Sequence, residues 1–162
     1  MSLFAIFLFL HVLGAIAAFG PSFGALPILG AMGGKEPMHA NFALRVTGAV
    51  SHRVIWPLAL VQGLTGIGLV VTGSVDMTKA LWLDVAIVLY VIALGFSYFR
   101  QTPALAKLIE MTSTPPPPPV PGAAPAGPPP AMLALIKQVQ QGGMILGLLV
   151  AVIVFLMVTK PF

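Results

Sequence analysis

The sequence predicts an all-α fold, a membrane-embedded bundle of four transmembrane helices. Only 7% of the 162 residues are charged and 58% are hydrophobic, whereas soluble domains carry about 25% charged residues. Four apolar runs each approach the ~20 residues that a helix needs to cross a hydrocarbon layer about 30 Å thick. The predicted spans cover about residues 3–25, 54–73, 81–99 and 144–158. Because the remaining stretches are short, we expect a single membrane domain over residues 1–162.

The first run is expected to remain in the protein as a span. The two residues before it, Met1 and Ser2, carry no basic side chain, and the apolar stretch is longer than that of a secretory signal. Four spans place both termini on one side of the membrane.

The basic residues predict an orientation. Lys79 and Lys160 fall on the side of the termini, and six basic residues fall on the other side: Lys35, Arg45, Arg53, Arg100, Lys107 and Lys137. Cytoplasmic loops carry the excess of lysine and arginine. We therefore expect the termini on the non-cytoplasmic side of a bacterial inner (plasma) membrane.

Three stretches between the runs are amphipathic. Residues 33–51 are expected to lie along the headgroups or to extend span two, and residues 104–111 and 132–141 are expected to extend spans three and four. Between the last two lies a proline-rich cytoplasmic loop, residues 112–131, with five consecutive prolines at Pro115–Pro119. Because proline lacks an amide donor, this loop is expected to be a polyproline II or disordered tether. It is either a spacer or a docking site for a proline-binding partner.

Small residues recur at four-residue intervals within the spans. Such spacing lets helix backbones approach closely in lipid. Pro21 and Pro57 should each free a backbone carbonyl, of Ala17 and Arg53, and Pro21 should kink or end its helix. The predicted helix-packing positions are Gly14, Gly20, Gly24, Gly63, Gly66, Gly143 and Gly147.

A few polar side chains fall inside the spans, where each is expensive and therefore a candidate site. At a rise of 1.5 Å per residue, His11 and Thr65 both lie about 12 Å from the ends of their spans on the side of the termini, and Gln62 lies about 16 Å deep. Tyr90 lies about 15 Å deep. We predict that His11, Gln62, Thr65 and Tyr90 form one intramembrane polar layer.

His11 has a structural and a functional interpretation. In the first it is a neutral histidine bonded to Thr65 or to a carbonyl at a kink. In the second it is a ligand for haem b or a metal, or a proton relay. The other histidines, His39 and His52, should lie more than ~15 Å away in depth, which disfavours a bis-histidine haem within one chain.

Composition excludes several classes of function. The absence of cysteine excludes disulfides, thiolate metal sites and cysteine nucleophiles. The net charge of +4 is not organised as a basic run with interleaved aromatics, so we expect no nucleic-acid binding. No catalytic motif is present.

Short motifs suggest a family. His11-Val12-Leu13-Gly14-Ala15, Trp56-Pro57 and the run from Gln62 to Leu69 resemble a family of small bacterial four-span proteins, described as predicted integral membrane proteins with a domain of unknown function. The likeness continues through Trp82-Leu83, Leu89-Tyr90-Val91, Gln101 and Leu105, and omits the proline-rich loop. His11 and Gly14 are also distantly similar to copper-resistance D type proteins and to membrane haem-associated oxidases of porphyrin synthesis. Those likenesses imply haem or copper chemistry at His11.

Three functions follow as expectations. The first is a non-catalytic accessory or structural bundle that contacts the lipid bilayer, and either a second copy of itself or another membrane subunit. The second is a haem- or metal-binding redox protein that uses His11. The third is a small transporter or channel, suggested by the glycines and prolines that interrupt spans one and two.

Overall fold

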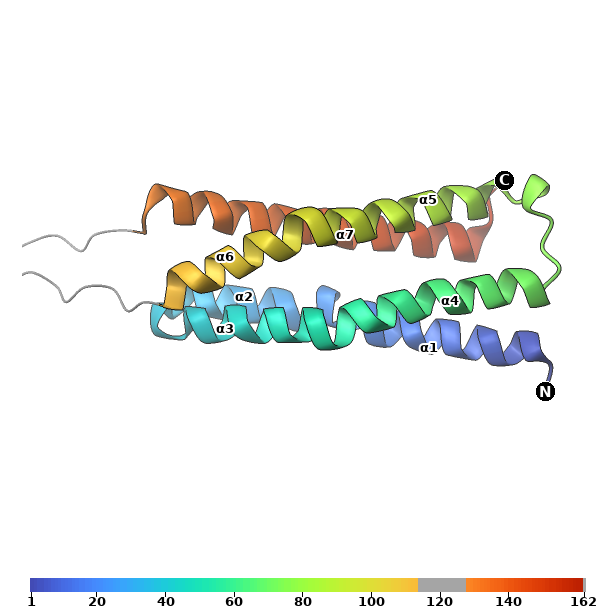
Figure 1. Cartoon of the computed structure of the whole chain (residues 1–162), viewed down its shortest axis with the longest axis horizontal. Helices are drawn as coiled ribbons and strands as arrows, with labels where there is room; N and C mark the ends of the chain where they lie inside the picture. Colours follow the sequence, from blue (N-terminus) through green and yellow to red (C-terminus); the bar gives the residue numbers. More distant parts are fainter. Residues whose placement is uncertain (114–127, 162) are drawn as a thin grey trace, which may run out of the picture.

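The computed structural model describes residues 1–113 and 128–161, and it places four long helical spans side by side (Figure 1). All four are long and apolar enough to cross a membrane, and within the described residues the regular structure is helical throughout. The predicted all-α fold with four spans is therefore confirmed. The spans are Leu3–Lys35, Met38–Thr72, Leu81–Ser113 and Pro130–Thr159.

The spans extend well past the predicted limits. The second has 35 residues, which corresponds to about 50 Å of helix, against a hydrocarbon thickness of about 30 Å. The added residues lie at the end away from the termini, because apolar runs mark only the part of a helix that lipid surrounds. Residues 33–51 accordingly form helix, mostly as an extension of span two.

Span one breaks once. Helix α1 (Leu3–Phe23) begins at Ser2, whose hydroxyl accepts a bond from the amide of Ala5 at 3.2 Å, and α2 (Ala25–Lys35) follows it. Of the two predicted outcomes at Pro21, a kink or an end, the helix does not end there, since it continues through the proline and breaks at Gly24, where φ is −126° and ψ is −75°.

Spans two and three each contain a π-helical segment. Span two runs from α3 (Pro37–Val50) through η1 (Ser51–Ile55) to α4 (Trp56–Thr72). Span three runs from α5 (Leu81–Phe96) through η3 (Ser97–Gln101) to α6 (Thr102–Ser113). Both segments end two residues before a proline, Pro57 or Pro103. Because a proline cannot donate to the carbonyl four residues earlier, a π-helical turn at this point accommodates the missing bond.

Span four is one continuous helix, α7 (Pro130–Thr159). The predicted proline-rich loop is shorter than expected at both ends, since Thr112 and Ser113 belong to α6 and Pro130 and Ala131 to α7. Residues 114–127, which contain the five consecutive prolines, lie outside the described residues.

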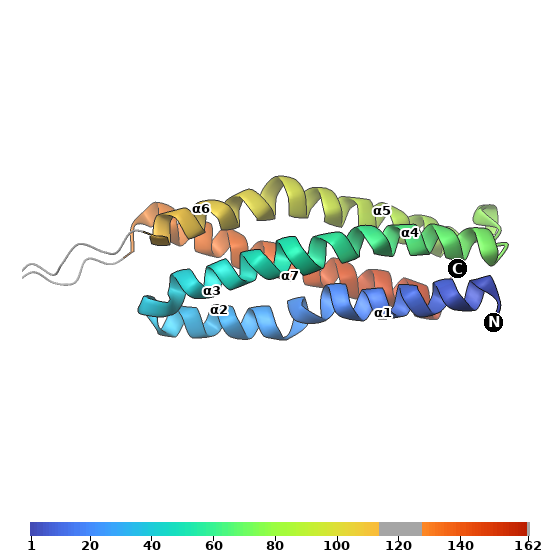
Figure 2. The same cartoon turned by 60° about the horizontal axis from the view of Figure 1, so that its bottom comes forward.

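The three interruptions fall at one level and divide the bundle into two halves (Figure 2). Gly24, η1 and η3 each lie roughly 25–30 Å from the ends of their spans near the termini. We call this level the junction. The terminal half consists of α1, α4, α5 and residues 143–159, and the basic half consists of α2, α3, α6 and residues 130–142. The six basic residues that the sequence assigns to one side all lie in the basic half or at the junction.

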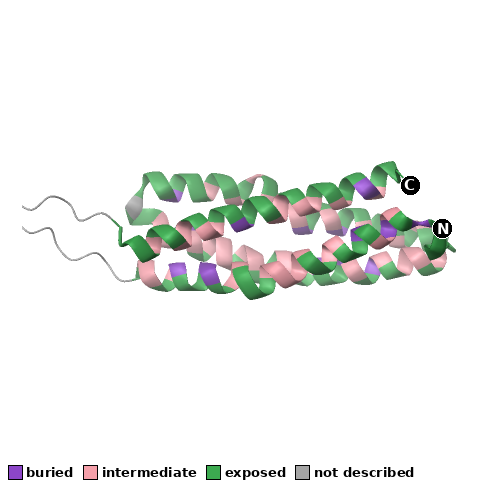
Figure 3. Cartoon of the chain, turned by 90° about the horizontal axis from the view of Figure 1, so that it is seen from above, coloured by how far each residue is buried: buried purple, intermediate pink, exposed green. Residues whose placement is uncertain are grey.

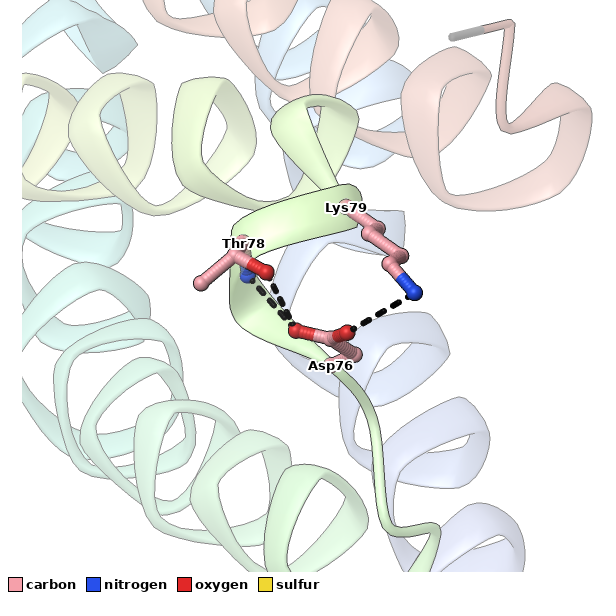
Figure 4. A network of polar contacts seen from close by, with 3 residues as sticks. All are labelled: Asp76, Thr78 and Lys79. Atoms are coloured by element: carbon pink, nitrogen blue, oxygen red, sulfur yellow. Dashed lines mark hydrogen bonds and ion pairs between the residues drawn. The ribbon is translucent and has the colours of Figure 1, made fainter.

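Both chain termini lie at the end of the bundle that also holds the short 3-10 helix η2 (Met77–Lys79) (Figure 1). Asp76 caps η2, because its carboxylate accepts bonds from the amide and hydroxyl of Thr78 at 3.0 and 2.6 Å and pairs with Lys79 at 3.6 Å (Figure 4). These contacts, the Thr78 hydroxyl first, lower the pKa of Asp76.

Few residues are buried, and most of the buried ones are small (Figure 3). Large apolar side chains face outward along every span, including Phe9 at 63% and Leu64 at 67% exposed. In water such a surface would aggregate, whereas lipid solvates it. The outward apolar face and the small-residue interior therefore agree with a membrane environment.

Candidate functional site: an intramembrane polar layer

Among the residues of the predicted polar layer, a bond joins His11 of α1 to Thr65 of α4. His11 Nδ1 lies 2.9 Å from Thr65 Oγ1. Both residues stand about 12 Å from the ends of their helices, so the level inferred from the sequence agrees with the contact. Gly66 lies beside the ring, since a Cβ at this position would sit 3.4 Å from His11 Cε1.

The hydrogen bonds of Thr65 favour one tautomer of His11. The Thr65 hydroxyl donates to the carbonyl of Val61 at 3.0 Å or of Gln62 at 3.1 Å. A hydroxyl has one proton, so its oxygen is left to accept from His11 Nδ1–H. Nε2 of the neutral ring is then unprotonated and carries a lone pair.

Gln62 lies one turn from Thr65 on the same side of α4, and its side chain is only 7% exposed. Its Oε1 has no hydrogen-bond partner within the described residues. Gly14 of α1 makes room for this oxygen, because a Cβ at Gly14 would lie 2.8 Å from it. The amide group is therefore enclosed between two helices without being fully satisfied.

Tyr90 belongs to a separate contact. Its hydroxyl donates to the carbonyl of Ala59 at 2.7 Å, and a Cβ at Gly63 would lie 2.8 Å from the same hydroxyl. Helix α4 therefore stands between the two contacts, with α1 bonded to one side and α5 to another. The structure brings His11, Gln62 and Thr65 together and joins Tyr90 to a different face of the same helix.

The predicted packing glycines also divide into two groups. Gly14, Gly63 and Gly66 face neighbouring helices closely, and Gly147 is in ordinary contact with Phe23 at 3.8 Å. A Cβ built at Gly20, Gly24 or Gly143 would meet no atom of another element within 4 Å in the described part of the chain.

Several close contacts escaped the sequence analysis. Gly68 is covered by the ring of Phe7, and Gly142, one residue before the predicted Gly143, packs against the amide of Gln101. Gln101 Nε2 donates to the carbonyl of Val139 at 2.9 Å, while its Oε1 has no partner among the described residues. The four-residue interval gave no signal for either glycine, because no other glycine stands four residues from Gly68 or from Gly142.

The remaining histidines lie elsewhere in the fold. His39 lies in α3 and pairs with Glu36 at 3.0 Å on an exposed surface, and His52 lies in η1 at the junction. Within residues 1–113 and 128–161, no three histidine, cysteine or acidic side chains gather closely enough to hold a metal.

The four apolar spans, the outward apolar face and the interhelical bonds at membrane depth define a multi-pass integral membrane protein. The comparison with family models identifies it further. The family described as "Predicted integral membrane protein (DUF2269)" matches residues 5–161, and the chain belongs to this family. No curated protein and no solved structure matches the chain. The distant likeness to copper-resistance D type proteins finds no support in these comparisons.

Proposed function

We propose that the protein is a non-catalytic four-helix membrane bundle with an accessory or structural role. The observation that carries this proposal is that the intramembrane side chains of His11 and Tyr90 each bond a neighbouring helix. Such bonds join helices in lipid and average about 0.6 kcal/mol. A side chain that already bonds a neighbouring helix stabilises the packing of the bundle.

An absorption spectrum tests this role. Protein expressed with a supply of haem and purified in mild detergent should show no Soret band. The His11→Ala variant should keep the helical content of the parent by circular dichroism. A Soret band that disappears in His11→Ala would contradict the accessory role and establish the second candidate below.

An accessory role also requires a partner in the membrane, either a second copy of the chain or another subunit. Because the chain contains no cysteine, single cysteines report neighbours without background. Val12→Cys and Val88→Cys place thiols on lipid-facing positions of α1 and α5, which are 51% and 56% exposed. We expect oxidative or bifunctional crosslinking in membranes to capture a neighbour at one of them, and a chain that stays uncrosslinked at every lipid-facing position would contradict the role.

We further propose a bacterial inner-membrane location, with the basic half on the cytoplasmic side. The support is the distribution of basic residues, two at the end of the termini and six in the basic half or at the junction. A membrane-impermeant maleimide should label Ser2→Cys in intact spheroplasts and should label Lys107→Cys only after lysis. The reverse pattern would invert the orientation.

A second candidate function is a haem- or metal-binding site at His11. The observation that favours it is the tautomer, since the Nδ1–H bond to Thr65 leaves Nε2 available as a ligand atom. Metal-ligating histidines typically donate their other nitrogen in this way. Thr65→Val should then shift or weaken any Soret band, whereas Tyr90→Phe, at the separate contact with α5, should leave it unchanged.

A further inference from the structure

An open groove runs along span two at the junction. Its volume is about 660 Å³, and one wall comes from Ile109 of α6. Two arginines and a histidine on span two, all exposed, line it together with apolar residues. The lining residues are Phe42, Arg45, Val46, Gly48, Ala49, His52, Arg53 and Ile109.

The groove lies at the level of lipid headgroups. Arg53 is 19 residues from Thr72, the terminal-half end of span two, which corresponds to about 28 Å of helix. This distance is close to the full thickness of a hydrocarbon layer. The terminal half therefore fills the hydrocarbon, and Arg53 emerges where phosphates begin.

The charge in the groove is uncompensated. In the described part of the chain, the ion pairs are Glu36 with His39 and Asp76 with Lys79. Neither Arg45 nor Arg53 has an acidic partner there, and no acidic residue lines the groove. Arginine binds phosphate oxygens in a planar, bidentate manner. The groove therefore has the charge that an anionic headgroup requires.

The walls of the groove are fixed from both spans. Asn41 Nδ2 donates to the carbonyl of Ile109 at 3.0 Å and to the hydroxyl of Thr112 at 2.9 Å, which holds α3 against α6. A smaller pocket of about 90 Å³ adjoins the groove and shares Gly48, His52 and Ile109 with it.

Residues from the two π-helical segments line this smaller pocket. Ser51 comes from η1, and Ser97 and Gln101 come from η3. Segments of this kind often occur at functional sites. The smaller pocket is therefore built in part from the irregular segments of two spans.

We propose that this groove binds one anionic phospholipid. Arg45 and Arg53 lie about 12 Å apart along the helix, so their side chains can converge on one phosphate. The acyl chains leave the groove at the Arg53 end and enter the hydrocarbon beside α4. This site is independent of the polar layer at His11 and of the function proposed above.

Native mass spectrometry of the full chain from lipid nanodiscs tests the proposal. The expected result is retention of one phosphatidylglycerol in preference to phosphatidylcholine. The double variant Arg45→Gln/Arg53→Gln should bind phosphatidylglycerol about thirtyfold more weakly, since each basic residue near a membrane surface contributes about fivefold. The matched control Lys35→Gln/Lys107→Gln removes the same charge from exposed positions outside the groove and should retain the lipid.

A second variant tests the shape of the site and keeps its charge. Ala49 is exposed and lines the groove, so Ala49→Phe should occupy the lipid's space without disturbing the core. We expect lipid retention to fall at least tenfold with helical content unchanged.

Three results would overturn the proposal. The first is equal retention of phosphatidylglycerol and phosphatidylcholine. The second is equal loss in the arginine and lysine double variants. The third is displacement of the lipid by millimolar inorganic phosphate, which would make the groove a site for a soluble anion.

Discussion

The terminal half and the basic half of the bundle both contain close glycine contacts, but different side chains cross between their spans. In the terminal half, α1 and α4 approach through glycines, with Phe7 against Gly68 and the amide of Gln62 against Gly14. In the basic half, Gly33 likewise lies against Ala43, and the amide of Asn41 crosses to Ile109, while at the junction the amide of Gln101 crosses to Val139. Lipid offers helices no hydrophobic gain on association, so close backbone approach replaces it.

The largest expected effect comes from substitutions that prevent the close approach of α1 and α4 in the terminal half. Gly68→Val places a branched side chain where the ring of Phe7 lies, and Gly14→Val does the same against Gln62. Overpacking of this kind costs about 1–3 kcal/mol. Unfolding in mixed detergent micelles should show this loss.

The matched control for these variants is Gly20→Val on α1, where a Cβ would meet no atom of another element within 4 Å in the described chain. We expect it to change the free energy of unfolding by less than about 0.5 kcal/mol. Equal losses at Gly14 and Gly20 would show that glycine spacing alone, and not contact, determines packing here.

The next effect concerns the bridging amide of the basic half. Asn41→Ala removes both bonds from Nδ2 to α6 and should cost about 1 kcal/mol. Hydrogen exchange should increase in α3 and α6 while α1 and α4 keep their protection. An increase spread evenly over both halves would mean that the bundle opens as one unit.

A smaller effect is expected in the polar layer. A double-mutant cycle with His11→Ala and Thr65→Val should give a coupling energy of about 0.6 kcal/mol, and at most about 1.7 kcal/mol, as for other hydrogen bonds within membranes. The same cycle on His11 and Tyr90 should give a value near zero, because these residues contact different faces of α4. Strong coupling in the second cycle would restore the single layer predicted from the sequence.

The smallest effect lies outside the hydrocarbon, at the Asp76 cap of η2. The pKa of Asp76 is lowered in the folded protein, so its carboxylate stabilises the turn above the unfolded pKa. That stabilisation is lost as the pH falls through the folded pKa. A titration followed by NMR should show the Thr78 amide signal moving with Asp76 at acidic pH, and Asp76→Asn should abolish this shift.

The sequence was sufficient for the number of spans and for the level of the polar residues. Depth follows from counting residues at a fixed rise, and this count predicts the meeting of His11 with Thr65. It does not give the direction in which a side chain leaves its helix, so it gave no sign that Tyr90 and His11 contact different residues of α4. An apolar run also marks only the residues that lipid surrounds. For this reason the sequence underestimated how far the spans extend into the basic half.

The π-helical segments illustrate a different limit. Prolines at 57 and 103 each signal an irregular turn, but a proline alone does not say whether a helix kinks, ends or widens. The repeated spacing of Ser51 to Pro57 and of Ser97 to Pro103 was available in the sequence. Only the structure shows that both stretches widen the helix at the same level and line one pocket.

These two widened turns have a consequence for how the chain can be re-engineered. A π-helical turn is an α-helical turn with one residue more, and each residue of an α-helix advances it by about 100°. Deleting one residue within η1 would therefore restore an α-helical turn and leave α3, with Arg45 and Asn41, facing nearly as before relative to α4. The same deletion in η3 would leave α6 nearly unrotated relative to α5, whereas a deletion outside these segments would rotate the basic half by about 100°. The two widened turns are thus the positions in spans two and three where the chain can lose a residue without changing which faces of the basic half look inward.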